Sequence, residues 1–151
     1  MLCVNITYAG TQVLYRVIFT TARIIMELKK YFETAQGTGI LSTADAEGNV
    51  DSAIYSRPHF FDDGTVALIM ADRLSHKNLQ SNSLAAYMFI EEAKGYKGRR
   101  FTMKMIREEK NSDQIPALRR STRKYSDEEE AEDKYLVFFE ITEERPLVSG
   151  G

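Results

Sequence analysis

The residues best suited to chemistry lie in one short stretch, residues 69–79, where an apolar run passes through a polar turn into a helical pattern. Ser75 is placed to cap that helix, and the unpaired N–H groups of a first helical turn favour an anion. Lys77 would supply a charge for a phosphate oxygen, Ser75 a neutral donor, and His76 a donor or a ring beside the ligand. The same residue types also begin helices that bind nothing, so both interpretations stay open here.

A second stretch, residues 52–58, ends a strand pattern with Arg57 followed by Pro58. Proline has no N–H to donate to a neighbouring strand, so regular pairing must stop there or lie at a sheet edge. Backbone groups near this strand end therefore become available to something other than a strand.

The elements that would position these two stretches are mainly β strands. The spacing of apolar residues predicts a short helix over residues 27–35. Strand patterns follow at residues 38–43, 50–61, 65–71, 84–90, 101–106 and 135–141. Turn residues at 45–49 and 62–64 predict that the first three strands form an antiparallel meander. Strands with such short turns predict a small Greek-key or meander barrel with helices at its mouths.

Residues 1–25 allow two interpretations. Alternating apolar residues at 2–8 and 13–19, around a turn at 9–12, predict a β-hairpin. Alternatively, Met26 is the true initiator and the preceding stretch is a translated leader. Polar residues interrupt the apolar ones throughout, which argues against a signal peptide or a membrane span. We therefore treat residues 26–151 as the domain and assign no function to residues 1–25.

The composition excludes several classes of site. The chain has 151 residues, a single cysteine and two histidines. Cys3 has no partner for an intrachain disulfide or a cysteine-built metal site, which favours a reducing, cytoplasmic location. A net charge of −2 gives no general attraction to nucleic acid or anionic membranes. With so few cysteines and histidines, we expect a bound molecule to carry the chemistry. No Walker loop, dinucleotide fingerprint or serine elbow is present.

Most of the charge lies in residues 107–133. A basic cluster over residues 119–124 is followed at once by an acidic run, and Ser126 with Glu129 forms a capping box that predicts a short acidic helix. One interpretation of the basic cluster is contact with nucleic acid. The acidic run beside it cancels that field and favours a solvated helical connection or a subunit contact.

An ordered series of short motifs gives the chain a family resemblance. The series comprises the helix, the strand Gly39-Ile40-Leu41-Ser42-Thr43, the turn Glu47-Gly48-Asn49, the strand end Ser56-Arg57-Pro58, Asp63-Gly64, Met70-Ala71-Asp72, Ser75-His76-Lys77 and the turn Gly95-Tyr96-Lys97-Gly98. From about Met26 to Leu147 this order resembles the pyridoxamine 5′-phosphate oxidase-like proteins. The resemblance implies a split β-barrel of Greek-key, FMN-binding type, and a homodimer with FMN between its subunits.

The resemblance also implies which residues hold the cofactor. Ala53, Ile54, Tyr55 and Ser56 would lie along the isoalloxazine ring, with Arg57 near the phosphate or a pyrimidine carbonyl. Met70, Ala71 and Asp72 would form the neighbouring wall, and Ser75, His76 and Lys77 the phosphate-binding turn.

Two positions depart from the family pattern. The true oxidases hold their substrate with a C-terminal Arg-x-His pair, whereas here Pro146 and Leu147 follow Arg145. The position of His76 commonly holds arginine in those oxidases. The missing Arg-x-His pair disfavours oxidation of pyridoxamine phosphate, and histidine in place of arginine at position 76 bears on how strongly the phosphate is held. No catalytic residue can be named.

The leading hypothesis is an FMN-dependent oxidoreductase that accepts hydride or electrons from a nicotinamide or similar donor. The alternative is a non-catalytic flavin-binding or electron-carrier protein. Neither hypothesis involves a metal, nucleic acid or a membrane. Tyr96, in a glycine-flanked turn, lies near a ligand in one interpretation and packs the turn in the other.

Overall fold

The computed structural model describes residues 12–119 and 126–148, and for residues 12–22, 127 and 129 the backbone alone. Its helices are α1 (Gln12–Thr34), α2 (Leu74–Ser81), α3 (Ile115–Leu118) and α4 (Asp127–Ala131). Its strands are β1 (Gly37–Ala44), β2 (Val50–Tyr55), β3 (His59–Phe60), β4 (Val66–Ala71), β5 (Leu84–Glu91), β6 (Gly98–Lys110) and β7 (Lys134–Pro146). The predicted acidic helix is confirmed as α4. Of the basic cluster, Arg119 is described and residues 120–124 lie outside the described residues.

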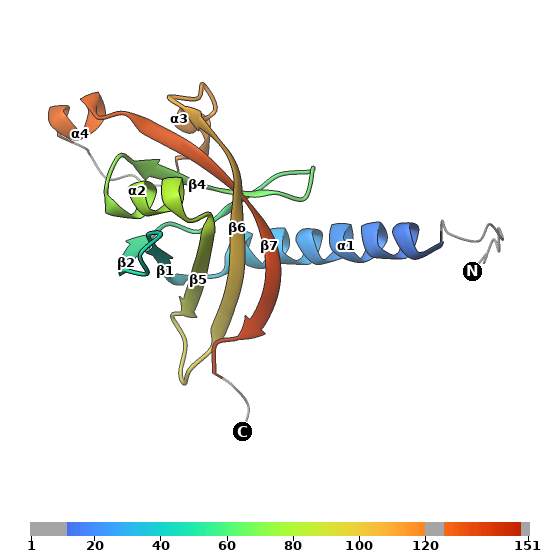
Figure 1. The fold of residues 1–151 in the computed structure, drawn as a ribbon. Helices are drawn as coiled ribbons and strands as arrows, with labels where there is room; N and C mark the ends of the chain where they lie inside the picture. Colours follow the sequence, from blue (N-terminus) through green and yellow to red (C-terminus); the bar gives the residue numbers. More distant parts are fainter. Residues whose placement is uncertain (1–11, 120–125, 149–151) are drawn as a thin grey trace.

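The strands form one curled, seven-stranded sheet in the order β2-β1-β5-β6-β7-β4-β3, with every neighbouring pair antiparallel (Figure 1). This half-barrel with flanking helices confirms the predicted mainly β split-barrel fold. Long strands β6 and β7 pair along most of their length and join the two halves of the sheet.

The predicted meander of the first three strands is confirmed in its antiparallel pairings, β1 with β2 and β3 with β4, but its middle strand is not continuous. The expected strand over residues 50–61 is two strands, β2 and β3, which lie at opposite edges of the sheet. The strand is interrupted at Pro58, because proline has no N–H to donate to a neighbouring strand. The other edge of β1 pairs with β5, from Gly37 with Glu91 to Thr43 with Ala85.

Helix α1 begins earlier than the sequence predicts. Residues 12–34 are helical, so the second strand of the predicted hairpin is wrong, while residues 2–8 lie outside the described residues. Val13, Leu14, Val17 and Ile18 also fit a helical period, and no glycine or proline interrupts residues 12–34. Figure 1 shows the start of α1 projecting beyond the sheet. No helix in the described ranges is long and apolar enough to cross a membrane.

The core beneath the sheet fixes the end of β2. Phe32 of α1 is buried and stacks on Phe60 with ring centroids 5.5 Å apart. The Tyr87 hydroxyl donates to the carbonyl oxygen of Ser56 across 3.0 Å. A Cβ atom at Gly39 would lie 2.0 Å from that hydroxyl, so only glycine leaves room for Tyr87 to reach the strand end. The core thus holds in place the stretch that, by the family resemblance, would lie along the cofactor.

Candidate functional site at the start of helix α2

Helix α2 follows β4 and packs against β1 and β2 (Figure 1). Its buried side chains fix its position: Asn78 donates to the Thr43 hydroxyl of β1 across 3.1 Å, and Leu79 packs in the core. The start of α2 is consequently held beside β2, as the proposed phosphate-binding turn requires.

The helix cap differs from the prediction. The N-cap is Arg73 rather than Ser75, and it makes no hydrogen bond from its side chain to the first turn. Ser75 lies inside the first turn, and the four residues from Leu74 to Lys77 include no acid. The backbone N–H groups at this helix start therefore lack a side-chain cap, an arrangement that favours an anion.

Ser75 faces β2 and belongs to a polar cluster with Asp51 and Tyr55. Its hydroxyl donates to Asp51 Oδ2 across 3.0 Å. The pKa of Tyr55 is raised, chiefly by burial and also by the Asp51 charge. The Ser75 hydroxyl and the Arg73 charge lower the pKa and offset part of this rise. A carboxylate that the sequence analysis did not single out thus lies against the proposed phosphate donor.

His76 faces the opposite way. Its Nδ1 lies 3.2 Å from Asp72 Oδ1, its Nε2 lies 2.8 Å from Glu108 Oε2, and its ring stacks on Tyr135 at 4.0 Å. Only 5% of the side chain is exposed. Both ring nitrogens are therefore engaged, and the side chain joins α2 to β6 and β7.

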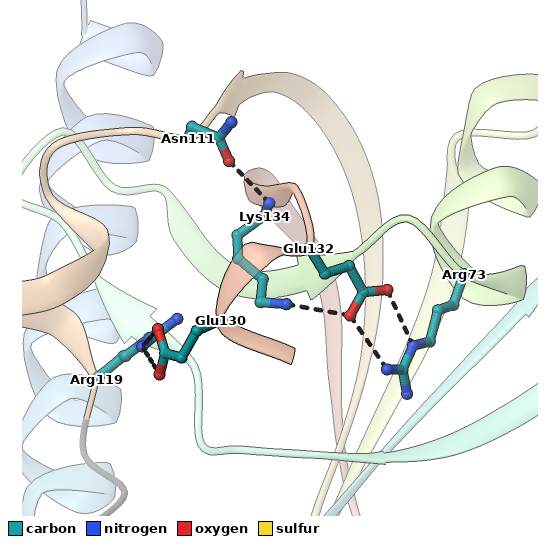
Figure 2. Close-up of polar contacts among 6 residues, drawn as sticks. All are labelled: Arg73, Asn111, Arg119, Glu130, Glu132 and Lys134. Atoms are coloured by element: carbon teal, nitrogen blue, oxygen red, sulfur yellow. Dashed lines mark hydrogen bonds and ion pairs between the residues drawn. The ribbon is translucent and has the colours of Figure 1, made fainter. Parts of the chain in front are cut away.

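The two cations of this turn have different surroundings. The Arg73 guanidinium binds both carboxylate oxygens of Glu132, which also accepts from Lys134 across 3.1 Å (Figure 2). Arg73, followed by Lys134, lowers the pKa of Glu132. Figure 2 also shows Arg119 paired with Glu130 of α4. Lys77 is exposed and forms no ion pair with any side chain that the structure describes. Its ammonium group remains available to an anion.

Arg57 lies at the end of helix α1. Its Nη1 donates to the carbonyl oxygens of Phe32 and Ala35 across 2.9 and 2.7 Å. These carbonyl groups belong to the last turn of α1 and the residue just beyond it, where a cation is favourable. The partners lie 22 and 25 residues away in the sequence, so no local pattern could reveal them.

The remaining predicted residues do not share one surface. Ala53 and Tyr55 alternate with Ile54, which is 78% exposed on the other face of β2. The Met70 side chain is in the core, which leaves its backbone to form a wall, and Ala71 is half-buried at the end of β4. Asp51 lies on the same face of β2 as Ala53 and Tyr55. Its spacing of two residues from Ala53 could have predicted that it belongs to the site. Nothing in the sequence pointed to Glu108 or Tyr135.

A separate hollow of about 820 Å³ lies at the other end of β5 and β6. Its lining includes Tyr96, Lys97, Arg99 and Arg145. Tyr96 is 86% exposed, and Arg99 pairs with Glu144 while also lying over the Tyr31 ring. Both interpretations of Tyr96, ligand contact and turn packing, remain predictions.

Comparisons with known proteins identify the fold. No protein-family model and no curated protein sequence matches the chain. Among solved structures, an FMN-binding protein of Syntrophomonas wolfei is 19% identical with a TM-score of 0.63, over 93% of this chain and 97% of that one. HupZ of Group A Streptococcus is 16% identical with a TM-score of 0.57, over 83% and 95% of the two chains. A putative pyridoxamine 5′-phosphate oxidase of Lactobacillus delbrueckii is 15% identical with a TM-score of 0.54, over 79% and 90%. The chain therefore has the split β-barrel fold of the FMN-binding, pyridoxamine 5′-phosphate oxidase-like proteins.

Proposed function

We propose that this protein binds FMN at the start of α2 and acts as an FMN-dependent oxidoreductase. The observation that carries the proposal is the uncapped first turn of α2, held beside β2 with the exposed Lys77 on its surface. Phosphate groups bind at helix starts because several N–H groups and the helix dipole point at the same place.

The surrounding residues fit FMN with one exception. Lys77 and the first-turn N–H groups of α2 would hold the phosphate. Strand β2 has one neighbour in the sheet, so alternate backbone groups along Ala53–Tyr55 face outward and can pair with the pyrimidine edge of a flavin. The backbone of Met70 and Ala71 would form the adjoining wall. The exception is Asp51, whose negative charge lies beside Ser75.

Bound FMN would supply hydride or single-electron transfer, while the protein binds and orients it. His76, the histidine at the start of α2, has both ring nitrogens within hydrogen-bond distance of carboxylates. We therefore assign no side chain to proton transfer. Arg145 lies at the distant hollow rather than beside α2 and is followed by Pro146. We therefore propose a donor such as a reduced nicotinamide rather than pyridoxamine phosphate as substrate.

Reduction of FMN by NADH tests this function. Purified protein with FMN is mixed with NADH in the absence of oxygen, and the absorbance of oxidised flavin is followed. We expect bleaching that is faster than with free FMN and is saturable in NADH. Binding of FMN without accelerated reduction by NADH or NADPH would favour the alternative, a non-catalytic flavin carrier.

We further propose a homodimer that covers the outer face of β2, β1 and β5. Ile54, Ile40 and Met88 lie in register across these strands, and Val50 and Leu84 are 76% and 54% exposed on the same face. Ser42 and Ser52, whose hydroxyl oxygens lie 2.8 Å apart, separate Ile54 from Val50 on this face. Exposed apolar residues gathered around a polar group on one sheet face are typical of a protein interface. A second copy packed on this patch would bring the neighbouring edge of β2 to the subunit interface, where the cofactor is expected. Sedimentation of the purified chain as a dimer is the expected result.

A further inference from the structure

Asp51 occupies an unusual position for a residue beside a phosphate site. It lies opposite Thr43 in the β1–β2 pair, on the face of the sheet that α2 covers. Its carboxylate accepts the Ser75 hydroxyl across 3.0 Å, and the Asp51 charge acts on Tyr55 nearby. The Asn78–Thr43 contact holds α2 over this pair of strands, so the first turn cannot move away from Asp51 without breaking a buried hydrogen bond.

Charges of both signs surround this helix start. Arg73 and Lys77 are positive, and Asp51, Asp72 and Glu132 are negative. Glu132 is bound to both Arg73 and Lys134. A phosphate monoester carries close to two negative charges at neutral pH. To accept a hydrogen bond from Ser75, it must also displace Asp51 and leave that half-buried carboxylate without its donor.

We propose that Asp51 is a specificity-determining residue that weakens the hold on the flavin phosphate, so that FMN is taken up and released rather than permanently retained. This inference rests on the proposed FMN site. Flavin is then a ligand that exchanges with free FMN in solution.

The test compares FMN with riboflavin, which has the same ring system and no phosphate. In Asp51→Asn, we expect the affinity for FMN to rise about tenfold at low salt, because a like charge within a few ångströms is removed. FMN release should slow by a similar factor, and riboflavin affinity should stay unchanged. Added salt should reduce the difference between the variant and the unmodified protein. Fluorescence titration and stopped-flow displacement of bound flavin measure these quantities.

Controls separate this effect from changes in folding and total charge. Asp62→Asn removes a fully exposed carboxylate in the β3–β4 turn and should leave FMN affinity unchanged. Asp51→Ser, a second removal of the carboxylate, should reproduce the gain if Asp51→Asn is poorly folded by circular dichroism.

Two outcomes overturn the inference in different ways. If the unmodified protein binds FMN but neither Asp51 variant strengthens it relative to riboflavin, Asp51 does not set phosphate affinity and the proposed function survives. If neither the unmodified protein nor the variants bind FMN or riboflavin, the proposed function fails and the inference fails with it.

Discussion

Replacing Lys77 with alanine is expected to lower the affinity for FMN about ten- to a hundredfold. A hydrogen bond between a charged group and its partner contributes about 1.5–3 kcal/mol, which corresponds to that range. Lys77 is exposed at the uncapped start of α2, and no carboxylate among the described side chains is paired with it, so its ammonium group can bind a phosphate without breaking an ion pair. Fluorescence titration of the apo-protein with FMN measures the loss.

Three comparisons make this result specific. Lys77→Arg keeps the charge and should retain most of the affinity. Lys97→Ala removes a lysine from the distant hollow and should change nothing. Riboflavin affinity should be the same in Lys77→Ala and the unmodified protein. An equal loss of FMN and riboflavin affinity would mean that Lys77 does not contact the phosphate.

Replacing Arg57 with alanine is expected to destabilise the fold by about 3 kcal/mol, because two charged hydrogen bonds to backbone carbonyls are lost. These bonds join the end of β2 to the end of α1, beneath which Phe32 packs in the core. Urea unfolding followed by circular dichroism measures the change. Arg57→Lys, which keeps the charge but has a different donor geometry, should recover part of the stability.

The same variant distinguishes two roles for Arg57. The family resemblance implies a contact with the flavin phosphate or a pyrimidine carbonyl, whereas the structure shows contacts with α1. If Arg57→Ala has unchanged stability and binds FMN weakly while folded, the residue acts on the ligand and not on the helix.

Local sequence patterns predicted the positions of strands better than they predicted which strands pair. The Arg57-Pro58 pair correctly indicated a break in strand pairing, and residues 84–90 form a strand within one residue of the prediction. The order of strands could not be predicted, because β1 pairs with β5 across more than forty intervening residues. Alternation at residues 13–19 fitted both a strand and a helix, and the helix prevailed.

In the candidate site, too, local structure could be predicted from the sequence and long-range contacts could not. The turn at residues 72–77 was recognised because an apolar strand, a polar turn and a helix follow one another in the chain. The partners of its side chains were not, because Asp51 and Glu108 come from strands distant in sequence. These long-range contacts decide that Lys77 remains exposed while His76 is buried.

Titration of the flavin-free protein with FMN, followed by flavin fluorescence, tests the central claim most directly. We expect saturation at one FMN per chain, with tighter binding of FMN than of riboflavin because the phosphate meets the start of α2 and Lys77. A fluorescence signal that does not change at any FMN concentration, in a protein shown to be folded, would contradict the account.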